Sequence, residues 1–245
     1  MFRHKGNRRT FSHNLRLAST LSFVAGIVNI AGVLSVATLT TNVTGHFAFF
    51  AEAISLNNYS KALTFIVFTF SFLLGAFVSN FLVEITAIKK PKIAHAIPMF
   101  LEIILLCLIG LTKNITSEYI AYTLLFAMGL QNALVTKISQ STVRTTHLTG
   151  LFTDLGIELS QLFFYKKAAE LKRLSVSIFL RISIILFFFF GCILGGLFYK
   201  TYELKILLFA AFILAIALIY DNLVVYYHLI KRKINRALKR SFFRI

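Results

Sequence analysis

The chain has 245 residues, of which 58% are hydrophobic and only 14% are charged. Soluble domains hold about 45–50% apolar and about 25% charged residues, so this composition excludes a soluble domain and indicates an integral membrane protein. The net charge of +17 is not accompanied by a recognition motif, so we expect no nucleic-acid partner.

Apolar runs along the chain predict an all-α integral membrane protein with six transmembrane helices, since about 20 apolar residues cross a bilayer core as a helix. The six runs are Leu17–Leu39, Leu63–Ile85, Ala94–Leu111, Tyr119–Val135, Val176–Phe198 and Ile206–Tyr227. Two apolar segments, Val43–Leu56 and Leu148–Phe164, are too short to cross. We expect them to form re-entrant or interfacial half-helices.

The distribution of basic residues predicts the orientation. With six spans, 21 of the 26 Lys and Arg residues lie on the side of the N-terminus, four lie on the other side, and Arg181 lies within the fifth span. Because basic loops stay on the cytoplasmic side, both termini are expected there. If the short segments also crossed, Lys61 would move to the cytoplasmic side and the cluster at residues 89–92 would leave it, which fits the rule less well.

These patterns divide the chain into four parts. Residues 1–16 form a basic cytoplasmic N-terminus, residues 17–112 and 119–228 form two membrane units, and residues 229–245 form a basic cytoplasmic tail. We expect the basic segments to contact the anionic lipids of the inner leaflet.

The two membrane units repeat one another. Leu21–Asn29 and Leu124–Asn132 carry Phe, Gly and Asn at the same spacing, and Thr40–Phe47 and Thr145–Phe152 are identical at five of eight positions. Each copy has three spans, and this odd number predicts that the second copy is inverted relative to the first, as in several transporter folds. The alternative is a duplicated bundle kept for packing alone.

Three segments carry a family resemblance: Val43–Gly45, Phe126–Asn132 and Val143–Gly150. Through them, residues 16–228 resemble the YoaK-type family of bacterial inner-membrane proteins of unknown function. The resemblance implies a multi-pass protein of the bacterial cytoplasmic (inner) membrane, and it supplies no substrate, reaction or catalytic residue. The family usually carries an acidic residue where this chain has Asn29.

The repeated Thr-Gly turns are the first candidate site. Thr44 and Gly45, and in the second copy Thr149 and Gly150, stand at the predicted starts of the short helices. Helix starts carry free N–H groups and a partial positive charge, so two of them near the midplane would bind a small anion or carboxylate. Arg144 would add a cation. The alternative is two ordinary capped helices.

Three amide side chains, Asn29, Gln131 and Asn132, lie in the middle of predicted spans. Gly26 shares a helix face with Asn29, and Gly129 shares one with Asn132. Small residues let helices approach so that amides can bond across them, which favours a packing role. The other interpretation is that the amides line a central path for a solute.

Single acids inside apolar segments are candidates for coupling to a proton or cation, since ionisable groups at bilayer depth are costly. They are Glu52 in the first short helix, Glu102 in the third span and Asp221 in the sixth.

Asp154, Glu158 and Gln161 form a polar stripe along one face of the second short helix. Nearby lysines favour a solvated face over a coupling role for these acids. Arg181, early in the fifth span, is expected to extend toward the inner headgroups.

Other chemistry is not indicated. The chain has no nucleophile–base set, nucleotide-binding fingerprint or clustered metal ligands, so we expect no enzyme activity, no cofactor and no metal. We predict a small secondary transporter or channel-like permease for a small polar or anionic solute. The alternative is a non-transporting membrane scaffold whose basic tail binds lipids or partners. The sequence leaves homodimer formation open.

Overall fold

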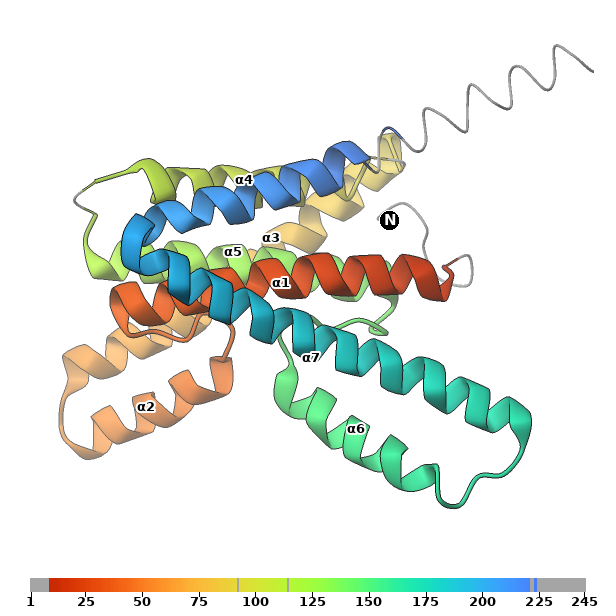
Figure 1. Ribbon diagram of the computed structural model, residues 1–245. Coiled ribbons are helices and arrows are strands. Elements are labelled where there is room, and N and C mark those ends of the chain that lie inside the picture. The colour runs from red at the N-terminus through yellow and green to blue at the C-terminus, as the bar shows by residue number, and fades with distance from the viewer. Residues whose placement is uncertain (1–8, 92, 114, 221–222, 224–245) are drawn as a thin grey trace, which may run out of the picture.

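The computed structural model describes residues 9–91, 93–113, 115–220 and 223, and among these residues it contains helices and turns but no strand. Figure 1 shows a bundle of long helices with two short helices on one side. The helices are α1 (Phe11–Val36), α2 (Val43–Ser55), α3 (Tyr59–Lys89), α4 (Ala96–Leu111), α5 (Ser117–Ser139), α6 (Leu148–Gln161), α7 (Ala168–Tyr202), the short 3-10 helix η2 (Glu203–Lys205) and a last helix over residues 206–220.

Four helical stretches of the described chain are long and apolar enough to cross a membrane: Phe11–Val36, Tyr59–Lys89, Ser117–Ser139 and Ala168–Tyr220. The last of these is interrupted at η2, where Glu203 has a positive φ of 49°. The chain reverses there, so α7 and residues 206–220 form a helical hairpin (Figure 1). The predicted third span, α4, is an apolar helix of only 16 residues.

Local signals explain where α2 and α3 begin. The side chain of Asn42 caps α2 by accepting from the Gly45 N–H, and the side chain of Asn58 caps α3 by accepting from the Lys61 N–H, each at 3.1 Å. At the end of α1, Ala37 adopts a left-handed conformation and its N–H bonds to the Val33 carbonyl. These turns lead the chain from α1 back into the middle of the bundle before α2 begins (Figure 1).

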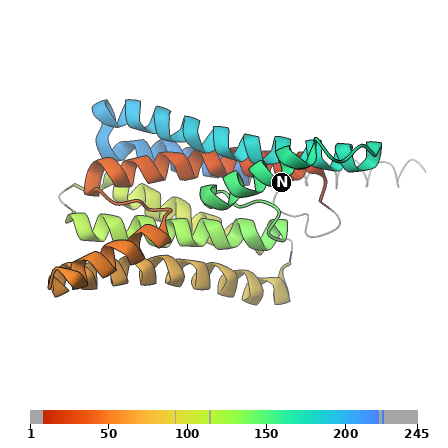
Figure 2. The same ribbon diagram turned by 90° about the horizontal axis from the view of Figure 1, so that it is seen from below.

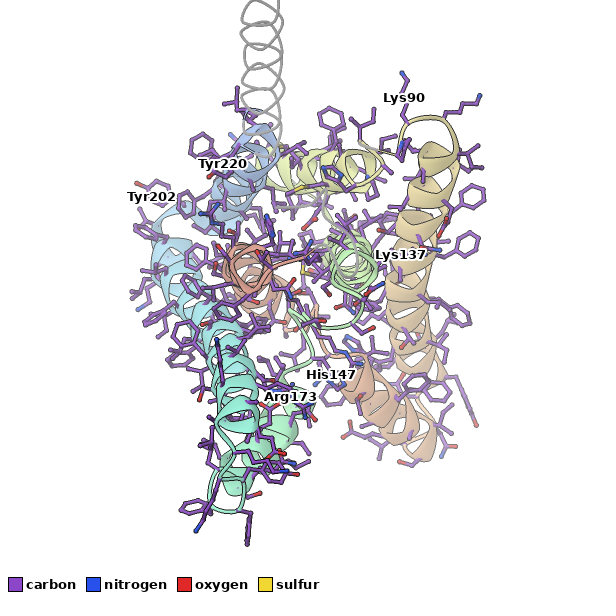
Figure 3. The ribbon with its side chains drawn as sticks, turned by 90° about the vertical axis from the view of Figure 1, so that its right-hand side faces the viewer. Lys90, Lys137, His147, Arg173, Tyr202 and Tyr220 are labelled. Atoms are coloured by element: carbon purple, nitrogen blue, oxygen red, sulfur yellow. The ribbon has the colours of Figure 1, made fainter. Side chains whose placement is uncertain are left out.

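The central helices of the bundle are α1 and α5. Seen along the bundle, α7 flanks α1 and α3 flanks α5, while α2 and α6 lie beside α3 and α7 (Figure 3). Figure 2 views the molecule from the side on which the two short helices lie. Helices of the first half therefore pack against helices of the second half, so the two predicted membrane units interlock.

The interlocking rests on close helix crossings at glycine. A Cβ atom on Gly26 of α1 would overlap the carbonyl oxygen of Phe188 in α7. In the same way, a Cβ atom on Gly129 of α5 would overlap the carbonyl oxygen of Phe72 in α3. Glycine allows these backbones to approach as in packed membrane helices.

Both crossings are reciprocal. Gly191 of α7 faces the carbonyl oxygen of Phe23 in α1, and Gly75 of α3 faces that of Phe126 in α5. Gly195 of α7 also lies close to α1, against Ile27 and Ile30, but the tightest contact of α7 is one turn earlier, at Gly191.

The outer helices expose large apolar side chains while the central helices are buried. On α3 and α7 these exposed side chains include Phe70, Phe77, Phe81, Phe187, Phe189 and Phe190. An apolar surface of this extent does not suit water and fits contact with lipid tails. The fold is therefore that of an all-helical protein with several apolar helices, as a membrane protein requires.

Candidate substrate cavity

A cavity of about 880 Å³ lies where the two halves meet, and we name it the central cavity. It is bordered by α1, α2 and α3 of the first half, by α5, α6 and α7 of the second, and by the turns before α2 and α6. The residues that line it are Asn29, Leu39, Thr41, Asn42, Val43, Thr44, Gly45, Ala48, Phe72, Asn132, Thr146, His147, Leu148, Thr149, Gly150, Thr153 and Phe188.

Six of the predicted site residues line this one cavity, three from each half. They are Asn29, Thr44, Gly45, Asn132, Thr149 and Gly150. In sequence the two sets are about a hundred positions apart. Tertiary packing brings them together because α1 and α5 lie side by side in the centre of the bundle (Figure 3).

The short helices begin at the cavity and diverge from it. Figure 1 shows α2 running from the middle toward one end of the bundle and α6 running from the middle toward the other end. The first N–H groups of a helix lack partners within it and carry partial positive charge. In α2 the Asn42 side chain occupies the Gly45 N–H, whereas α6 has no side-chain cap at His147 among the described residues. The start of α6 is therefore the better hydrogen-bond donor to a solute.

The two mid-span asparagines hold the turns in place. Thr41 donates a hydrogen bond to the side-chain oxygen of Asn29 at 3.0 Å, and Thr146 donates one to that of Asn132 at 3.1 Å. We expected these amides to bond between neighbouring spans. Both bond to the threonine turns, so each amide fixes one helix start relative to α1 or α5, and Asn29 also bonds across the α1–α7 crossing to the side chain of Cys192.

The lining of the central cavity is polar and includes the imidazole of His147. Hydroxyl and amide groups alternate with apolar walls from Phe72 and Phe188, and none of the described residues lining it is Asp, Glu, Lys or Arg. Such a lining offers donors and acceptors to a small polar solute, and the helix starts add partial positive charge for an anion.

Two further predicted residues lie outside the central cavity. Gln131 is buried, and its side-chain nitrogen donates to the carbonyl oxygen of Leu21 at 2.7 Å, so it ties α5 to α1. This bond fits the packing interpretation of the amides, and Gln131 does not line the central cavity. Arg144 lines a neighbouring, smaller cavity.

Of the three coupling candidates, the two that the structure describes do not line the central cavity. Glu52 is exposed on α2. Glu102 is buried in α4 at 1% exposure, and its Oε1 atom has no hydrogen-bond partner among the described residues. Asp221 lies outside the described residues, as does the basic tail.

The smaller cavity, named here the side cavity, has a volume of about 360 Å³. It lies between the turn before α6, α6 itself and α7. Its lining residues are Ser141, Thr142, Arg144, His147, Gly150, Leu151, Asp154, Ser177, Leu180 and Arg181.

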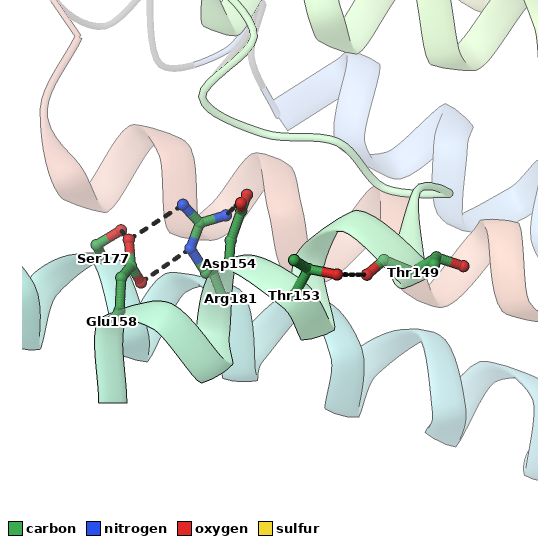
Figure 4. A network of polar contacts seen from close by, with 6 residues as sticks. All are labelled: Thr149, Thr153, Asp154, Glu158, Ser177 and Arg181. Atoms are coloured by element: carbon green, nitrogen blue, oxygen red, sulfur yellow. Dashed lines mark hydrogen bonds and ion pairs between the residues drawn. The ribbon is translucent and has the colours of Figure 1, made fainter. Parts of the chain in front are cut away.

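Arg181 is the centre of a polar network beside the side cavity (Figure 4). Its Nε and Nη2 atoms donate to the two carboxylate oxygens of Glu158 at 2.9 and 3.0 Å, and its Nη1 atom donates to Asp154 at 2.7 Å. Ser177 donates to Glu158 at 2.6 Å. Arg181 therefore has two carboxylate partners that were not predicted from the sequence, and Glu158 is a paired carboxylate rather than part of a solvated face.

Sequence reasoning missed this network because its partners lie on different helices. The available signal was an arginine inside an apolar run, which requires a counter-charge. Residues 154 and 158 are one helical turn apart and supply it once α6 folds back along α7. Within the described ranges no group of three or more His, Cys, Asp or Glu residues that could hold a metal ion was found.

Comparison with known proteins adds the family. Residues 17–220 match the family described as "Protein of unknown function (DUF1275)", and this match is compatible with the resemblance to the YoaK-type family. Neither the curated proteins nor the solved structures contain a match to this chain. Since the match spans most of the 245 residues, the chain belongs to the DUF1275 family.

Proposed function

We propose that this protein is a small secondary transporter or channel-like permease of the bacterial cytoplasmic membrane, and that the central cavity binds a small polar or anionic solute. One observation carries the proposal. Two Thr-Gly helix starts from distant parts of the chain, Thr44–Gly45 and Thr149–Gly150, line a single cavity of about 880 Å³. Facing half-helices of this kind form the solute sites of many transporters.

The proposed architecture has six spans in two inverted repeats. Its support is the matched pair of crossings, in which Gly26 meets α7 as Gly129 meets α3. Further support comes from the matched Asn–Thr hydrogen bonds and from the opposite directions of α2 and α6. A duplicated bundle kept only for packing would not require polar cavity residues at corresponding positions.

The proposed orientation places both termini in the cytoplasm. The α3–α4 and α6–α7 connections, which are rich in lysine, lie at one end of the bundle (Figure 1). The α2–α3 and α4–α5 connections and η2 lie at the other end, and they carry few basic residues. This separation of charge supports a cytoplasmic face at the first end.

In the proposed mechanism the solute accepts hydrogen bonds from the N–H groups at the start of α6 and from threonine hydroxyls. Asn29 and Asn132 keep the two helix starts in register. The helix dipoles favour a partial or full negative charge on the solute. Phe72 and Phe188 restrict the cavity to small molecules by closing its apolar walls.

Sided thiol labelling tests the proposal. Single cysteines replace Thr44 or Thr149 in a variant lacking Cys107 and Cys192, and the cells or vesicles are treated with a reagent that cannot cross membranes. A cavity that opens to each side in turn should react from both sides. Tyr59→Cys and Phe163→Cys are the controls, since both side chains are exposed near opposite ends of the bundle. They should react only from outside and only from inside, respectively.

The labelling also separates the proposal from a membrane scaffold. Failure of both cavity cysteines to react from either side, with both controls reactive, would overturn the transporter. Truncation of residues 229–245 that abolishes function while turn variants stay silent would favour the alternative, in which the basic tail binds lipids or partners.

A further inference from the structure

The side cavity shares a wall with the central cavity. His147 and Gly150 line both of them. On the first two turns of α6, Thr149 and Thr153 line the central cavity, while Leu151 and Asp154 line the side cavity. The start of α6 is therefore the partition between the two spaces.

The two carboxylate partners of Arg181 differ in their role. Glu158 binds Arg181 through two hydrogen bonds, is itself held by Ser177, and does not line the side cavity. Asp154 binds through a single nitrogen, lines the cavity, and its side chain is 49% exposed against 14% for Glu158. Glu158 is the fixed counter-charge, and Asp154 is the replaceable one.

The side cavity also contains a second cation. Arg144 is exposed and lines the cavity on the turn before α6. The hydroxyls of Ser141 and Thr142 line the same space. A guanidinium group recognises a carboxylate or phosphate through the same N–H geometry that it uses for aspartate.

We propose that the side cavity is an oxyanion site, in which a soluble carboxylate replaces Asp154 on the Nη1 atom of Arg181 and is also bound by Arg144. The inference rests on the proposed function in one respect: the side cavity would bind the solute before the solute enters the central cavity. It names the solute class of that function as a small organic or inorganic oxyanion.

The corresponding place in the first half has aromatic rings instead of an ion pair, and the charge beside them is that of Lys61, whose Nζ atom lies over the Phe65 ring at 6.0 Å from its centroid. There Phe49 of α2 stacks on Phe65 of α3, with ring centroids 5.3 Å apart. The oxyanion site therefore exists at one end of the path only. Of the 14 residues of α6 only Leu151 is buried. When a solute displaces Asp154 from Arg181, α6 therefore loses one of its few contacts with α7.

Anion-dependent thermal unfolding of the purified full-length protein tests the site. The probe is sodium acetate, titrated against sodium chloride at constant ionic strength. Asp154→Asn removes the competing charge, so the half-saturating acetate concentration should fall about three- to fivefold, the factor for an ion pair at a half-exposed position. Arg144→Gln, in an exposed turn, should raise it by a similar factor without altering the fold.

The matched control is Glu84→Gln. Glu84 is also a carboxylate paired with a base, Lys137, and it lines neither cavity. Its loss should leave the acetate response unchanged. An Asp154→Asn protein that responds like the wild type, or a Glu84→Gln protein that shifts equally, would overturn the site.

A lipid phosphate could use the same donors, so the titration is repeated with phosphatidylglycerol. A response of Asp154→Asn to this lipid but not to acetate assigns the cavity to a headgroup and overturns the solute site. Failure of the proposed function is distinguishable. Acetate binding that depends on Asp154, in a protein whose Thr44→Cys and Thr149→Cys variants are unreactive, leaves the oxyanion site standing without transport.

Discussion

In the first half of the molecule α2 lies against α3 through the stacked rings of Phe49 and Phe65, whereas in the second half Asp154 and Arg181 join α6 to α7. The positions correspond. Phe49 lies two residues after the last residue of its Thr-Gly repeat, Phe47, as Asp154 does after Phe152. Phe65 lies ten residues before the crossing glycine Gly75, as Arg181 does before Gly191. The same helix contact is therefore made by two aromatic rings in one hairpin and by an ion pair in the other.

The surroundings extend this contrast. His46, buried in α2, donates a hydrogen bond from Nε2 to the Leu39 carbonyl oxygen at 2.9 Å. Its ring contacts that of Phe68, which in turn contacts Tyr122. Its counterpart in the repeat is Leu151. The α2–α3 hairpin is thus closed by a cluster of aromatic rings with Lys61 over one of them, and the α6–α7 hairpin is closed by ion pairs beside a cavity.

This difference shows how a repeated fold can have two unlike ends. Ring stacking depends little on salt or on soluble anions, while an ion pair responds to both. The glycine crossings are alike in the two halves and the hairpins are not. We expect the crossings to set stability and the hairpins to set the direction of solute access.

The largest effect is expected at the crossings. Gly26→Ala and Gly129→Ala each place a Cβ atom against a backbone carbonyl, which should destabilise the protein by about 3 kcal/mol in a detergent-unfolding titration. Gly156→Ala is the control, since no atom of another helix lies within 4 Å of its added Cβ. Equal losses at Gly26 and Gly129 would show that the two crossings contribute alike, and a loss at only one of them would contradict that equivalence.

Next in size is the ion pair of the second hairpin. Arg181→Met leaves Glu158 without its cation and should cost about 2 kcal/mol, less than for a fully buried pair because the site is partly exposed. Hydrogen exchange of residues 148–161 in the wild type should quicken as salt rises, and exchange of residues 43–55 should not. Equal salt sensitivity of the two segments would contradict the distinction between the hairpins.

A smaller effect is expected at the paired amides. Asn29→Ala and Asn132→Ala each remove the acceptor of one threonine hydroxyl, at a cost of about 1 kcal/mol in unfolding free energy. Because both turns line the central cavity, each variant should also slow the reaction of the thiol reagent with a cysteine placed at position 44 or 149. A loss of stability with normal access would reduce these amides to packing residues.

The smallest effect is expected at the surface ion pair. Lys137 and Glu84 are 44% and 55% exposed, so Glu84→Gln should change the unfolding free energy by less than about 0.5 kcal/mol. A larger change would mean that charge in general, and not the position of Arg181, distinguishes the second hairpin.

Much of the local structure was predictable from the chain alone. The segments 43–56 and 148–164 were expected as short helices and are α2 and α6. The Thr-Gly repeats placed Thr44 and Thr149 at helix starts, because threonine, asparagine and glycine favour that position whatever surrounds them. Arg181 could not be placed, since the identity of its partners depends on which helix folds back beside it.

By itself the sequence determined the helices, their apolar character and the repeated polar turns, because periodicity, capping and hydropathy act within a few neighbouring residues. Only the tertiary structure decided that α1 crosses α7 and α5 crosses α3, that both turns line one cavity, and that Asp154 and Glu158 hold Arg181. These contacts join residues far apart in the chain, and they depend on how closely backbones approach at glycine rather than on any local preference.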